Sequence, residues 1–359
     1  MLDVELARRQ TGVTMAVQPD LKIYEYDNGG GGGTCFLSGT RIASPEGAMC
    51  VENLTVGAMV LTLDGASRPV RWLGHRGVDC SRYRDPSEVW PYRIEAGAFD
   101  DGKPERDLWL SRGHTLCVEN ALIQVDHLVN GATIVQVPRD LVEYWHVELD
   151  SHDVLLAEGL PAESYRDDGN RPQFENGGAF IEAYPDFLPK LDSDTCLPVV
   201  KSGPLLERTK ARLLARAELL GYRLSDDPDL HVMADGKRIV PVRSGARFEF
   251  QLPEATVLEL RSRSFVPAQI NPTNGDARAL GVAVTKLELD AIPVPLASDS
   301  GFKGWHRLEQ DASLQWRWSN GTAQLPAGTR NVVIELCHEG SYYWDRTAAA
   351  VVPRLAAAG

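Results

Sequence analysis

Residues that can act on a peptide bond lie at two separated positions in the chain, and the first is a cysteine behind a glycine run. Cys35 directly follows Asn28, five glycines and Thr34. A thiol at this position can attack the carbonyl carbon of Thr34 and convert the Thr34–Cys35 amide into a thioester, with a free amine left on Cys35. An amide is more stable than a thioester, so the shift requires strain and a proton donor from the fold. The alternative is a small buried side chain without chemistry.

The second position pairs a hydroxyl with an imidazole. Ser111 and His114 stand three residues apart in a stretch that is typical of a strand, a tight turn and a second strand. This arrangement predicts that the two side chains lie together. Imidazole suits proton transfer because its pKa lies close to working pH, although a lone histidine is more often structural or exposed.

Three blocks of the sequence resemble the Hint family, which comprises inteins, hedgehog carboxyl-terminal domains and bacterial intein-like domains. They run over 35–61, 110–118 and 142–164, and the last contains a Leu-Leu-Ala-Glu-Gly-Leu-Pro-Ala-Glu-Ser run that is similar to a bacterial subfamily. The resemblance covers about 35–165. It implies an all-β autocatalytic module with Cys35 as its nucleophile.

The resemblance also implies roles for three further residues. His114 would donate a proton to the nitrogen of the scissile bond, and Ser111, which stands where the family has threonine, would hold a hydrogen bond near the same peptide. His146 aligns with a position that is commonly an aspartate in splicing members, so it is a second acid or base candidate. A cross-strand polar residue is an equal alternative for His146, and His152 is interpreted as structural.

The sequence departs from inteins at the end of this region. The family's closing His-Asn pair falls on Glu163 and Ser164, and serine cannot cyclise as asparagine does. We therefore expect amino-terminal cleavage without splicing, with residues 1–34 as substrate and water or a small nucleophile as acyl acceptor. The alternative is a non-catalytic Hint-fold binding protein that recognises its ligand through a carboxyl-terminal β domain. A cysteine hydrolase acting on external peptides ranks third.

The elements that must position these residues are short strands. Alternating apolar runs separated by turn residues continue from Cys35 to about 158. A helix is predicted over 204–220, with Pro204 at its start and Gly221 after its end. We predict a mainly all-β chain with the following parts: a leader with a glycine hinge (1–34), a Hint domain (35–165), a connector that includes the helix (166–228), a β-sandwich-like domain (229–345) and a tail (346–359).

Composition limits the partners. The chain has 359 residues, a formal net charge of −13, 43% hydrophobic and 24% charged residues, which is typical of a globular protein. The acidic balance argues against nucleic acid, and no apolar run reaches the length of a membrane span. No signal peptide is recognised, so we expect a soluble protein, cytoplasmic or secreted without a cleaved signal.

Cofactors and ligands are the last expectations from the sequence. Six cysteines lie far apart without close pairs, so neither a metal site nor a cofactor is predicted. The carboxyl-terminal domain contains an aromatic cluster. Its members could bind a carbohydrate, but packing in a core or against a protein is the favoured interpretation: Trp305, Trp316, Trp318, Tyr342, Tyr343 and Trp344.

Overall fold

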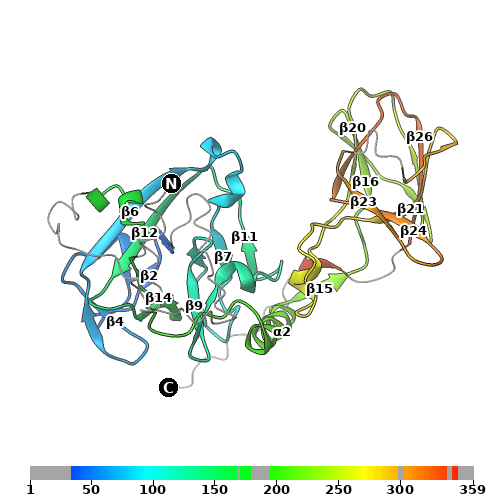
Figure 1. Cartoon of the computed structure of the whole chain (residues 1–359). Helices are drawn as coiled ribbons and strands as arrows, with labels where there is room; N and C mark the ends of the chain where they lie inside the picture. The colour runs from blue at the N-terminus through cyan, green and yellow to red at the C-terminus, as the bar shows by residue number, and fades with distance from the viewer. Residues whose placement is uncertain (1–33, 168–169, 179–194, 298–302, 338–341, 347–359) are drawn as a thin grey trace, which may run out of the picture. The chain divides into compact units, whose positions relative to one another are not determined.

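The computed structural model describes residues 34–167, 170–178, 195–297, 303–337 and 342–346. Residues 1–33 of the predicted leader and 347–359 of the predicted tail lie outside the described residues. Within the described part, no helix is both long and apolar enough to cross a membrane. Strands dominate, as the sequence predicts (Figure 1).

The first β region contains two six-stranded sheets. One sheet has the order β11-β7-β8-β1-β12-β6. Its strands are β1 (Phe36–Leu37), β6 (Trp72–Asp79), β7 (Tyr92–Ile94), β8 (Leu108–Leu110), β11 (Ile134–Gln136) and β12 (Leu141–Glu148). The short β1 lies between β8 and the long β12, so its residues contact both neighbours.

The second sheet has the order β10-β9-β14-β13-β2-β3. Its strands are β2 (Arg41–Ile42), β3 (Met49–Cys50), β9 (Thr115–Val118), β10 (Ala121–Gln124), β13 (Val154–Ala157) and β14 (Leu160–Glu163). A separate hairpin pairs β4 (Met59–Leu61) with β5 (Ser67–Pro69). Short 3₁₀ turns join the strands: η1 (Val51–Asn53), η2 (Cys80–Arg82), η3 (Pro86–Glu88), η4 (Val125–Leu128) and η5 (Arg171–Gln173).

One apolar core joins the two sheets. Phe36 and Leu110 from the first sheet pack in the same cluster as Leu116 and Leu155 from the second, and all four are fully buried. Each buried side chain of this size contributes about 1.5–3 kcal/mol to folding. Alternate residues of a half-buried strand face the core. For this reason the alternating apolar pattern in the sequence predicts these strands.

Strand β6 is one element that the sequence did not predict in full. Only its first residues, Trp72 and Leu73, continue the β-like pattern that begins at Val70, and the glycines Gly74 and Gly77 interrupt that pattern beyond them. The structure explains Gly74, because a Cβ there would lie 2.2 Å from the Trp72 ring. The glycine allows the indole to fold over the strand, so β6 continues to Asp79 and pairs with β12 along its whole length.

Helix α2 (Pro204–Leu219) forms where a helix was predicted. Leu213 on this helix is fully buried and belongs to the core of the first region. The helix is therefore part of a packed structure as well as a link in the chain. A one-turn helix, α3 (Pro267–Ile270), lies in the region that follows.

The second β region contains a four-stranded sheet, β17-β16-β20-β25, and a seven-stranded sheet, β18-β19-β26-β21-β24-β23 with β22 beside β21. The four-stranded sheet consists of β16 (His231–Ala234), β17 (Lys237–Ile239), β20 (Leu258–Arg261) and β25 (Thr322–Leu325). The larger sheet consists of β18 (Val242–Ser244), β19 (Arg247–Gln251), β21 (Ala283–Leu289), β22 (Ile292–Pro293), β23 (Trp305–Gln310), β24 (Gln315–Ser319) and β26 (Asn331–Leu336).

The two sheets of this region share one core. Val232 and Leu260 from the smaller sheet pack with Phe250 and Ile334 from the larger one, which is the arrangement of a β-sandwich. A two-stranded sheet pairs β15 (Tyr222–Ser225) with β27 (Tyr343–Arg346). The prediction of a mainly all-β chain with a second sandwich-like region is confirmed, whereas the exact domain boundaries stay a prediction.

Candidate functional site

Cys35 directly precedes β1 and has no exposed surface. Because Phe36 pairs with Leu110 on one side and with Trp145 on the other, the next residues outward are Ser111 and His146. The sheet register therefore brings the three residues to one end of β1. Cys35 packs in an apolar cluster formed mainly by β6, β12 and the segment that follows β14: Trp72, Val78, Cys80, Val89, Val142, Tyr144, Tyr165 and Phe174.

Two hydrogen bonds join Cys35 to Ser111. The amide N–H of Cys35, which belongs to the Thr34–Cys35 bond, donates to Ser111 Oγ at 2.7 Å. The backbone N–H of Ser111 donates to the carbonyl oxygen of Cys35 at 2.9 Å. The predicted serine hydroxyl thus contacts the predicted scissile peptide directly, and Cys35 is fixed on both sides.

His146 contacts the other side of the same bond. Its Nε2 lies 2.7 Å from Thr34 Oγ1, and the imidazole is fully buried. Burial, together with the nearby His114 and Arg76, lowers the pKa of His146 well below its ordinary value, so the ring is neutral at pH 7. The neutral ring is therefore suited to a hydrogen bond with the Thr34 hydroxyl rather than to an ion pair.

His114 lies beside the same peptide and is also fully buried. Its ring centroid is 4.3 Å from that of Phe36 and 6.2 Å from that of His146. Within the described residues, neither ring nitrogen has a hydrogen bond of normal geometry. Burial lowers the pKa of His114 to about 4, opposed by the Glu163 charge and the Cys35 backbone. The neutral ring can therefore accept a proton at pH 7.

The thiol of Cys35 is protonated in the resting fold. Burial raises its pKa to about 12, although the Arg76 charge and the Ser111 hydroxyl act in the opposite direction. From that pKa, roughly one molecule in 10⁵ carries a free thiolate at pH 7. Any attack by this sulfur must therefore be coupled to removal of its proton.

The segment that follows β14 covers the site. Tyr165 and Phe174 are buried, and their ring centroids lie 4.6 Å and 5.6 Å from that of His146. Arg171 stacks over Trp72 at 4.2 Å. Its guanidinium is bonded to two carboxylates, those of Asp167 at 2.7 Å and Glu148 at 2.8 Å. The sequence predicted an extended connector here, because its polar, glycine-rich composition does not indicate burial.

A buried acid and a buried histidine lie next to His114. Glu163 Oε1 accepts a hydrogen bond from the N–H of Thr115 at 2.7 Å, and its Oε2 is 3.4 Å from His152 Nε2. Burial opposes the charge on His152, but Cys196 and Glu163 raise its pKa to about 9. Sequence reasoning noted Glu163 only as a departure from inteins. Its distance in sequence from His114 hid the contact, which arises because β14 pairs with β9.

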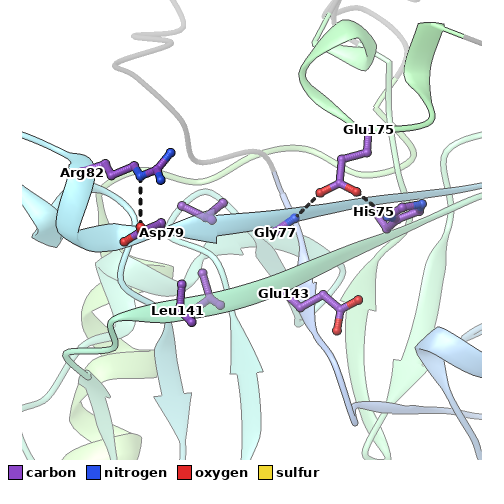
Figure 2. A pocket seen from close by; sticks show the side chains of 9 residues that line it. His75, Gly77, Asp79, Arg82, Leu141, Glu143 and Glu175 are labelled. Carbon is purple, nitrogen blue, oxygen red and sulfur yellow. Dashed lines mark hydrogen bonds and ion pairs between the residues drawn. The ribbon is translucent and has the colours of Figure 1, made fainter.

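A shallow pocket of about 600 Å³ lies at the far end of β6 and β12. Figure 2 shows Glu175 reaching the N–H of Gly77 and the His75 ring, and Arg82 bonded to Asp79. Two further lining residues, Val78 and Val142, belong to the apolar cluster around Cys35. The pocket thus borders the outer part of that cluster.

The predictions about metals and the aromatic cluster concern other parts of the chain. No group of three or more potential metal ligands occurs among the described residues. In the second β region, Phe265 stacks on Tyr342 at 4.8 Å and meets Trp318 and Tyr343 edge-on. Trp318 and Tyr343 are each 5% exposed. These two rings pack against their neighbours, while a ligand of this region stays an untested prediction.

Residues 34–169 match a family model described as the Hint domain. The crystal structure of the MchDnaB-1 intein is similar to 36% of the chain, over 99% of its own length, with 16% identity and a TM-score of 0.28. The crystal structure of the gp41-1 intein covers 37% of the chain and 99% of itself, with 17% identity and a TM-score of 0.28. A bacterial intein-like domain from Clostridium thermocellum, known from a solution structure, covers 37% and 99%, with 12% identity and a TM-score of 0.28.

No curated protein matches the chain. The family match begins at Thr34, one residue before the predicted nucleophile, and ends at residue 169. The prediction of a Hint domain in this part of the chain is confirmed.

Proposed function

We propose that the Hint domain at residues 34–169 cleaves its own chain between Thr34 and Cys35. The observation that carries this proposal is the 2.7 Å hydrogen bond from the amide N–H of Cys35 to Ser111 Oγ. This contact directs the serine hydroxyl at the nitrogen that must leave. An acceptor on the N–H raises the electron density on that nitrogen, which favours its protonation and the breaking of the C–N bond.

The reaction follows from the protonation states of the buried groups. Cys35 Sγ attacks the carbonyl carbon of Thr34 while neutral His114 takes the thiol proton. The C–S bond forms, the C–N bond breaks, and the same proton passes to the nitrogen, which leaves as the free amine of Cys35. His146, bonded to Thr34 Oγ1 at 2.7 Å, holds the acyl side in place. Water then breaks the C–S bond and gives a Thr34 carboxylate and a free thiol.

Release at the carboxyl-terminal end is not part of the proposal. Ser164 is fully buried, and its Oγ accepts a hydrogen bond from the N–H of Asp153 at 2.9 Å. A serine has no side-chain amide that could cyclise. The closing residues of the domain therefore support the strand structure and leave residues 165–359 attached.

Intact mass of the full chain, incubated with and without dithiothreitol, tests the cleavage. The expected products are residues 1–34, carrying dithiothreitol as a thioester in the treated sample, and residues 35–359. Cys35→Ala removes the nucleophile and leaves an uncleaved chain. Cys50→Ala, which removes a half-buried thiol at the edge of the second sheet, retains cleavage. An intact wild-type chain under all conditions would overturn the proposal.

A non-catalytic Hint module is the alternative. The full burial of the Cys35 thiol, with its pKa at about 12, favours this reading because such a thiol is a weak nucleophile. In that case residues 34–169 act as a scaffold, and recognition falls to the second β region. Equal masses for the wild type and Cys35→Ala, with both proteins folded, would support the alternative.

A further inference from the structure

Arg76 is a buried cation whose charge acts on the Cys35 thiol. It lies on β6 opposite Tyr144 of β12, and two residues before it Gly74 pairs with His146. Residues paired across a sheet point to the same face, so the side chains of Arg76, Tyr144 and His146 share one face. Arg76 is only 8% exposed.

The guanidinium of Arg76 lacks the partners that a buried charge usually has. Within the described residues, its Nε and Nη2 are buried and have no hydrogen-bond partner. By contrast, Arg171 in the same neighbourhood is neutralised by Asp167 and Glu148. A buried charge without compensation strongly destabilises a fold. An anion that forms near Arg76 would therefore be stabilised by its charge.

The side chains around Arg76 do not supply that anion at rest. The Cys35 thiol and the Tyr144 phenol are both neutral at pH 7, because burial raises the pKa of each. His146 is neutral because burial lowers its pKa. Other titratable or charged groups on the packed elements are His114 from the turn before β9, Cys80 from η2, and Tyr165 and Arg171 from the covering segment.

The proposed cleavage creates negative charge in this cluster. The sulfur of Cys35 becomes anionic as its proton leaves, and the charge then moves to the carbonyl oxygen of Thr34. We infer that Arg76 is the electrostatic partner of this charge and promotes the attack of Cys35 by stabilising its anionic sulfur. This inference rests on the proposed function for its role in the reaction, but its effect on the thiol can be measured without cleavage.

The test compares Arg76→Met with Arg76→Lys, because the two side chains have similar length and differ in charge. The intact chain is treated with iodoacetamide at several pH values, and alkylation is followed on the peptide that spans the uncleaved Thr34–Cys35 bond. The expected result is alkylation of Cys35 at least ten-fold slower in Arg76→Met at every pH below 10, with most of the rate kept in Arg76→Lys. Arg82→Met, at an exposed arginine just after β6, makes the same change in net charge and leaves the rate unchanged.

Equal alkylation rates in Arg76→Met and wild type, with thermal melting unchanged, would overturn the inference, and so would equal slowing in Arg76→Met and Arg76→Lys. Should Arg76→Met not fold, Arg76→Gln provides the neutral variant. If no variant and no wild-type chain is cleaved, the proposed function fails, while the alkylation rates still decide the role of Arg76. If cleavage occurs, its rate is expected to follow the same order as alkylation.

Discussion

Each β region of the chain contains a buried arginine, and the two arginines differ in their hydrogen-bond partners. In the second region, buried Arg317 donates to the carbonyl oxygens of His306 and Leu296 at 2.6 and 3.0 Å. In the first region, buried Arg76 has two nitrogens without a partner among the described residues. The ring nitrogens of His114 are likewise without normal hydrogen bonds there.

The difference between the two arginines shows where to look for chemistry in a chain with two β regions. Buried polar groups without partners lower stability. In the first region, Arg76 and His114 both act on Cys35, which contributes the nitrogen of the Thr34–Cys35 bond. Their position beside one bond supports the proposed cleavage, whereas the hydrogen bonds of Arg317 are explained by folding alone.

The largest expected effect comes from comparing alanine substitutions at two buried serines, one in each β region. Ser111→Ala removes the acceptor from the scissile amide, so we expect a 10²- to 10³-fold slower cleavage, as for other single hydrogen bonds at a reacting centre. Ser319 Oγ accepts the N–H of Val282 at 3.1 Å, and Ser319→Ala should cost about 1–3 kcal/mol of stability without slowing cleavage. Mass-monitored cleavage and urea unfolding measure the two effects. An unchanged cleavage rate in Ser111→Ala would break the comparison.

Acid should destabilise the first region through His114. The pKa of this histidine is about 4 in the fold and 6.5 in the unfolded chain, so between these values the unfolded chain binds a proton that the folded chain does not. The neutral ring contributes about 3 kcal/mol to the free energy of unfolding. This contribution is fully present above pH 6.5 and is lost as pH falls toward 4.

Urea unfolding at pH 4 to 7, monitored by hydrogen exchange at amides of β9 and β12, measures this loss of stability. His114→Gln removes the titrating group, so its stability should change less over the same pH range. A wild-type profile as flat as that of His114→Gln would show that burial does not hold the ring neutral.

A smaller effect is expected from Glu163. Its charge raises the proton affinity of His114, so Glu163→Gln, which keeps the shape, should slow cleavage by about ten-fold and displace its pH dependence toward lower pH. Asp235→Asn is the matched change in the second region, where the carboxylate accepts the N–H of Val257 at 2.8 Å. We expect Asp235→Asn to leave the cleavage rate unchanged. A slower Glu163→Gln with an unmoved pH profile would indicate a purely structural role.

The smallest effect is expected at the surface of the second region. Arg278 bonds to Asp276 and Glu309 at 2.7 and 2.8 Å, and its side chain is 42% exposed. Exposed ion pairs contribute little. Arg278→Gln should therefore leave both the melting temperature and the cleavage rate close to wild type, and a large loss in either would contradict the contrast between the regions.

The strands and the first residues of the site could be predicted because they have local signals. Alternating apolar residues mark β9 and β13, and the helix has a proline at its start. The block around Cys35 and the Ser111–His114 spacing predicted residues that the structure brings together at one peptide bond, while their catalytic roles stay predictions.

Other parts of the site have no local signal. The glycines of β6 conceal a long strand, and Arg76 within it looks like an ordinary surface arginine. Glu163 and His114 meet only because two strands far apart in sequence pair. Sequence patterns record periodicity along the chain, and these contacts are made across it.

The covering segment has a consequence for the extent of the working unit. Tyr165, Arg171 and Phe174 belong to the wall around His146 and Trp72, although they follow the last strand of the module. A fragment that stops at Ser164 would admit water to the imidazole and remove the aromatic lining on one side. The smallest piece able to keep this centre dry therefore extends to about residue 177, well past the point where the β pattern ends.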